Sequence, residues 1–68
     1  MTFLEYCEYI YKQLNDNKPL SNLQKDYILQ IQDAIESGKK LKDIPRGNAK
    51  IDARLVIMAM YAEWKSMR

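Results

Sequence analysis

The most reactive side chain in this sequence is the thiol of Cys7, the only cysteine among 68 residues. A catalytic thiol of the papain type needs a histidine beside it as a base, and the sequence contains no histidine. Cys7 also falls within an apolar helical stripe, where a free cysteine behaves as a small hydrophobic residue. We therefore predict that Cys7 is a core residue and not a nucleophile.

Acid–base chemistry would have to come from carboxylates, two pairs of which stand three residues apart: Glu5 with Glu8, and Asp33 with Glu36. Paired acids catalyse when burial drives their pKa values apart, whereas these four fall on the polar faces of predicted helices. The two glycines are isolated, so the sequence has no glycine-rich phosphate loop, and it lacks histidine, the commonest metal ligand. The sequence thus predicts a protein that is not an enzyme and that uses no cofactor, metal or small-molecule substrate.

A group of basic residues stands between the second and third predicted helices: Lys39, Lys40, Lys42, Arg46 and Lys50. Binding to a phosphate backbone requires clustered cations more than it requires a high net charge, which is only +2 here. A helix-turn-helix is disfavoured, because that motif has a turn of only 3–4 residues and this connection covers residues 39–48. The following helix is also apolar where a recognition helix presents Arg, Asn or Gln to bases. A solvated loop is the first interpretation. The alternatives are a nucleic-acid-associated regulator and binding to an acidic protein patch.

Three helices must position these residues, and we expect them over residues 3–15, 22–37 and 49–66. Thr2 with Glu5 and Ser21 with Gln24 match the capping box, in which each side chain bonds the backbone N–H of the other residue. Gly38 can adopt the left-handed conformation that ends the second helix. Apolar residues recur at helical spacing between these signals.

The predicted fold is an all-α three-helix bundle in which residues 1–68 form a single helical domain. With 47% apolar residues, 29% charged residues and only two prolines, the composition argues against disorder and against a turn-rich β fold. In the basic connection, Leu41 and Ile44 are expected to pin the chain to the core. Asn48 is the expected N-cap of the third helix.

The third predicted helix carries apolar residues on two sides. One face holds Ile51, Leu55, Met58, Ala59 and Ala62, and the other holds Val56, Ile57, Met60, Tyr61 and Trp64. Two short companion helices offer few neighbours for both faces. The two companions could still straddle the helix, in which case both faces would be core.

Three residues outside the apolar stripes, Tyr6, Tyr9 and Leu29, also look surplus to so small a core. We therefore predict that the face with Tyr61 and Trp64 binds a protein partner or a second copy of the chain, since aromatic residues and Met are enriched in interface centres. The function predicted first is a non-enzymatic α-helical interaction module that self-associates or binds a protein partner, with inhibition of that partner as one form of the binding.

The sequence also bears on location. One cysteine cannot form an internal disulfide, and Glu5 and Glu8 interrupt what would be a signal segment. The longest apolar run, residues 55–62, is well short of the roughly 18 residues of a membrane span. A cytoplasmic protein without membrane contact is expected. In its Lys, Asn, Ile and Tyr usage, so short a chain resembles accessory proteins of AT-rich bacterial genomes or their phages.

Overall fold

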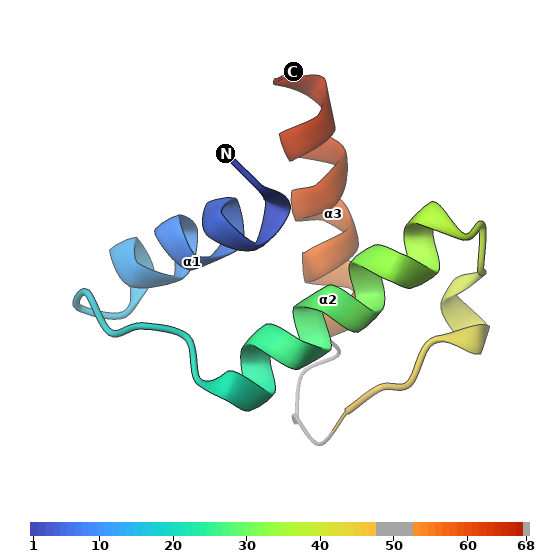
Figure 1. Ribbon diagram of the computed structural model, residues 1–68, viewed down its shortest axis with the longest axis horizontal. Coiled ribbons are helices and arrows are strands. Elements are labelled where there is room, and N and C mark those ends of the chain that lie inside the picture. The colour runs from blue at the N-terminus through green and yellow to red at the C-terminus, as the bar shows by residue number, and fades with distance from the viewer. Residues whose placement is uncertain (48–52, 68) are drawn as a thin grey trace.

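A computed structural model of the chain describes residues 1–47 and 53–67 (Figure 1). Its helices are α1 (Phe3–Leu14), α2 (Asn22–Glu36) and α3 (Ala53–Ser66), with a short 3₁₀ turn, η1 (Leu41–Asp43), between the last two. The described ranges contain no strand. The prediction of an all-α three-helix bundle is confirmed. The first two helices each end one residue earlier than predicted, whereas the predicted start of the third and its cap, Asn48, lie outside the described residues.

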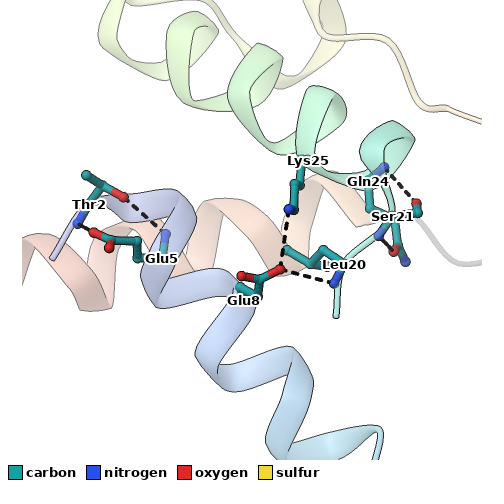
Figure 2. A network of polar contacts seen from close by, with 7 residues as sticks. All are labelled: Thr2, Glu5, Glu8, Leu20, Ser21, Gln24 and Lys25. Atoms are coloured by element: carbon teal, nitrogen blue, oxygen red, sulfur yellow. Dashed lines mark hydrogen bonds and ion pairs between the residues drawn. The ribbon is translucent and has the colours of Figure 1, made fainter. Parts of the chain in front are cut away.

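Both predicted capping boxes are present (Figure 2). Thr2 Oγ1 accepts a hydrogen bond from the Glu5 backbone N–H at 3.1 Å, and Glu5 Oε1 accepts one from the Thr2 N–H at 2.7 Å. Ser21 and Gln24 exchange the same pair of bonds, at 3.2 and 2.8 Å. The bonds from the Thr2 backbone and side chain lower the pKa of Glu5, so this carboxylate stays ionised at the positive end of the α1 dipole.

Glu8 joins the first two helices at the chain segment between them (Figure 2). Its Oε2 accepts a hydrogen bond from the Leu20 backbone N–H at 3.3 Å and lies 3.7 Å from Lys25 Nζ. The Leu20 side chain is buried against the core. The start of α2 is thereby held against the middle of α1.

The end of α2 has the predicted glycine stop. Gly38 has a φ of +77°, and the backbone N–H of Lys39 reaches the carbonyl oxygen of Ala34 at 2.9 Å. A second bond, from the Gly38 N–H to the Ile35 carbonyl oxygen at 3.1 Å, completes a Schellman motif. The chain then turns back, and Ile44 is buried as predicted, whereas Leu41 is only half-buried.

The core is organised around three rings that we call the aromatic cluster, Phe3, Tyr61 and Trp64. Phe3 packs edge-on against Tyr61 with ring centroids 5.2 Å apart, and its centroid lies 5.5 Å from that of Trp64. The polar atoms of the two α3 rings are hydrogen-bonded. Trp64 Nε1 donates to the Met1 carbonyl oxygen at 3.2 Å, and the Tyr61 hydroxyl donates to Glu36 Oε2 at 3.0 Å. These contacts fix the C-terminal half of α3 against α1 and α2.

The molecule is flat, with extents of 32 × 31 × 17 Å. Seen down its shortest axis, the three helices spread across the plane instead of stacking into a thick bundle (Figure 1). So thin a protein cannot surround its apolar residues on every side. Part of the apolar surface of the helices therefore stays accessible.

Candidate functional site

The α3 face predicted to be an interface is largely core. Ile57, Tyr61 and Trp64 keep only 7%, 8% and 7% of their surface exposed, so these three are not available as docking anchors on the folded chain. Val56 is exposed and Met60 half-buried. Of the three residues that looked surplus to the core, Tyr6 is buried as well, whereas Tyr9 and Leu29 are exposed.

The physical reason for this correction is the aromatic cluster. The sequence showed two apolar faces on α3 but held no signal for which one turns inward. Phe3, at the first position of α1, supplies a ring that fits against Tyr61 and Trp64 and draws that face into the core. The opposite face, with Leu55, Ala59 and Ala62, is left exposed.

An apolar surplus does remain, in a groove of about 350 Å³ where all three helices meet. Its lining comes from α1, from the N-terminal half of α2, from α3 and from the connecting residues Leu20, Arg46 and Gly47. We call it the apolar groove, and its lining residues are Cys7, Ile10, Tyr11, Leu14, Leu20, Gln24, Tyr27, Ile28, Arg46, Gly47, Ala53, Val56, Ile57 and Met60.

Two aliphatic side chains of the apolar groove are largely open to solvent. Leu14, at the end of α1, is 79% exposed, and Val56, in the first half of α3, is 54% exposed. Few residues with polar side chains line it: Tyr11, Gln24, Tyr27 and Arg46. Chemically, the apolar groove can bury aliphatic or aromatic groups and offers a few hydrogen bonds at its edge.

Cys7 is also among the lining residues of the apolar groove, yet the burial of its side chain makes the thiol unreactive. Burial raises the pKa of Cys7 to about 11, because a thiolate would lose its hydration there. The thiol is therefore protonated at neutral pH, in agreement with the absence of a histidine base from the sequence. The prediction that Cys7 is a core residue is confirmed by its burial.

Labelling of Cys7 should therefore be slow in the folded protein. Raising the pKa from 9.0 to about 11 reduces the thiolate fraction roughly 100-fold at any pH below 9. The pKa of Cys7 is higher in the folded chain than in the unfolded chain, so the protonated thiol stabilises the fold below pH 9. This contribution to the free energy of unfolding is lost as the pH rises from 9 towards 11. We expect Ellman's reagent to react at least about 100-fold faster in guanidinium chloride than in buffer. Similar rates in the two solvents would contradict the burial of this thiol.

The loop that closes one end of the apolar groove is fixed by side chains from two helices. The Tyr27 hydroxyl lies 2.8 Å from the carbonyl oxygens of both Pro45 and Arg46, between which it donates its single hydrogen. Gly47 follows with a φ of +75°, and a Cβ there would lie 3.4 Å from the Tyr27 ring. From α3, the Arg54 guanidinium donates to the carbonyl oxygen of Ile44 at 2.8 Å. The backbone of Arg46 is therefore anchored beside the groove.

Four of the five residues predicted as a nucleic-acid site are described, and Lys50 lies outside the described residues. The four are exposed: Lys39, Lys40, Lys42 and Arg46. Within residues 1–47 and 53–67 none of them takes part in an ion pair. Only Arg46 reaches the apolar groove.

Two other kinds of site were considered. In the described part of the chain, no three His, Cys, Asp or Glu side chains come together as a metal site would require. Nor does any helix in those same ranges combine the length and apolarity needed to cross a bilayer.

Comparison with known proteins adds no relative: no family model, curated protein or solved structure matches the chain. The function must therefore be inferred from the geometry of the apolar groove and from the exposed basic residues Lys39, Lys40, Lys42 and Arg46.

Proposed function

We propose that this protein is a small non-enzymatic interaction module that binds an amphipathic helix of a protein partner in its apolar groove. The observation that carries the proposal is the groove itself, lined by apolar side chains from all three helices and edged by exposed Leu14 and Val56. Helix-in-groove binding needs such a surface, into which residues at i, i+3, i+4 and i+7 of the partner insert. The first half of α3 is thus the binding part of the helix.

A helix fits this surface better than a small molecule does. Small-molecule sites enclose most of their ligand and use a few convergent polar groups to orient it. The apolar groove instead leaves Leu14 and Val56 largely in solvent, and few polar residues line it. An exposed apolar surface edged by polar groups is typical of protein–protein contacts.

Replacement of Val56 by Asp tests the proposal. Peptides selected from a displayed library of amphipathic helices, of about 15 residues so that they can hold a helix, should bind the full chain. Val56→Asp places a charge in the groove at an exposed position, so we expect unchanged helicity and at least about a tenfold loss of affinity. Leu23→Asp is the matched control, because Leu23 is 82% exposed on α2 and does not line the groove. Equal binding by Val56→Asp and the unmodified protein would rule the groove out.

The alternative of nucleic-acid binding has one observation in its favour, the exposure of Lys39, Lys40, Lys42 and Arg46 on a single loop. If phosphate contacts dominate, DNA affinity should fall steeply with salt, with a slope that decreases as the basic residues are replaced by Gln. No measurable DNA binding at low salt would remove this alternative.

A further inference from the structure

We infer that the helix bound in the apolar groove is acidic, with a carboxylate at the end that meets the loop before α3. This inference rests on the proposed function and adds the charge of the partner. It follows from the position of Arg46, which is the sole charged residue among the described lining of the groove.

Arg46 is well placed to receive an anion. Its side chain is exposed and has no hydrogen bond or ion pair with a described residue. The Tyr27 hydroxyl holds its carbonyl oxygen at 2.8 Å, so the start of the side chain is fixed at the groove. A guanidinium presents a planar set of donors that matches a carboxylate in a bidentate arrangement. The backbone of Arg46 is therefore already in place, and only its side chain has to be ordered when a carboxylate arrives.

Other charges of the same loop have the same sign as Arg46. Lys39, Lys40 and Lys42 are exposed in the preceding loop, where Asp43 is the only acid among residues 39–47. Glu8, whose Oε2 bonds the backbone N–H of the groove residue Leu20, is itself paired with Lys25. The carboxylate of Glu8 is thus already balanced by Lys25, and Arg46 takes part in no ion pair with a described residue. Complementary charge guides encounter and sets the direction in which a helix lies.

The same charges disfavour a second copy of this chain as the occupant. In a symmetric dimer both copies present the same surface patch, so the basic loops of both copies, each with an Arg46, would lie in one interface. The net charge of +2 on each copy adds to this repulsion. An acidic helix of a different protein avoids both costs.

Selection from a helix library with randomised charge tests the inference. Apolar residues are kept at i, i+3, i+4 and i+7, and the flanking positions draw freely on Asp, Glu, Lys, Arg and Ser. Helices enriched on the unmodified full chain should carry Asp or Glu near one end. Arg46→Glu should weaken an enriched acidic helix about tenfold and should itself enrich basic helices, because attraction is replaced by repulsion. Lys39→Glu makes the same charge change outside the groove lining, and its effect should stay within about twofold.

The outcomes separate the inference from the proposed function. Enriched helices without an acidic preference, or an unchanged preference in Arg46→Glu, would overturn the inference and leave helix binding in place. Failure to enrich any helix would overturn both. Sedimentation showing a dimer that Val56→Asp dissociates would also overturn the inference, because a second copy would then occupy the groove.

Discussion

Phe3→Ala is expected to leave the chain largely unfolded in buffer at room temperature. The Phe3 side chain has 0% of its surface exposed and contacts both Tyr61 and Trp64. Removing a buried Phe ring costs about 3–5 kcal/mol, and a single hydrophobic core in a chain as short as these 68 residues rarely supplies more than about 3–5 kcal/mol. The substitution therefore removes most of the stability of the fold.

Urea unfolding followed by far-ultraviolet circular dichroism measures this loss. Tyr9→Ala is the matched control, because Tyr9 is an aromatic residue of the same helix but is exposed. That variant should unfold within about 0.5–1 kcal/mol of the unmodified protein. A Phe3→Ala protein with an unchanged midpoint would show that the aromatic cluster does not organise the core.

Trp64→Glu should unfold the chain to a similar extent. The change removes a buried indole whose ring centroid lies 5.6 Å from that of Tyr61 and whose Nε1 donates to the Met1 carbonyl oxygen at 3.2 Å. It also introduces a carboxylate into an apolar site, which is costly unless the group is paired or becomes protonated. We expect a loss of more than about 3 kcal/mol, close to or above the total stability of so small a domain.

Val56→Glu is the informative comparison for Trp64→Glu. Both substitutions place a carboxylate on α3, but Val56 is exposed in the apolar groove whereas Trp64 is in the core. Circular dichroism should therefore show native helicity for Val56→Glu and a large loss for Trp64→Glu. If Trp64→Glu kept native helicity, the originally predicted interface face would regain support.

Local signals in the sequence were sufficient to predict where the first two helices begin and where the second one ends. Thr2 and Ser21 cap helices with bonds to residues three positions away, and Gly38 ends a helix through bonds to Ala34 and Ile35. Such contacts depend on neighbouring residues alone, so their spacing predicts them. The burial of Ile44 was also predictable, because an isolated apolar residue in a polar connection usually contacts the core.

The apolar groove could not be predicted in the same way, because its lining comes from all three helices and from two connecting segments. Periodicity revealed that α3 carries two apolar faces, but the choice between them depends on where Phe3 packs. The burial of Tyr6 was missed for the same reason. The hydrogen bonds from Tyr27 to the loop join residues 18 and 19 positions apart and have no local signal.

The most direct test of the apolar groove is a titration of the full chain with an enriched helix, followed by backbone amide chemical shifts. The groove account predicts that the largest changes fall on lining residues from all three helices, among them Leu14, Gln24 and Val56. Leu23 and Leu29, exposed outside the groove, should change little. Two results would contradict the groove as the binding site. One is shift changes confined to residues 39–42, and the other is changes over the aromatic cluster together with a collapse of the amide shift dispersion, which would indicate unfolding.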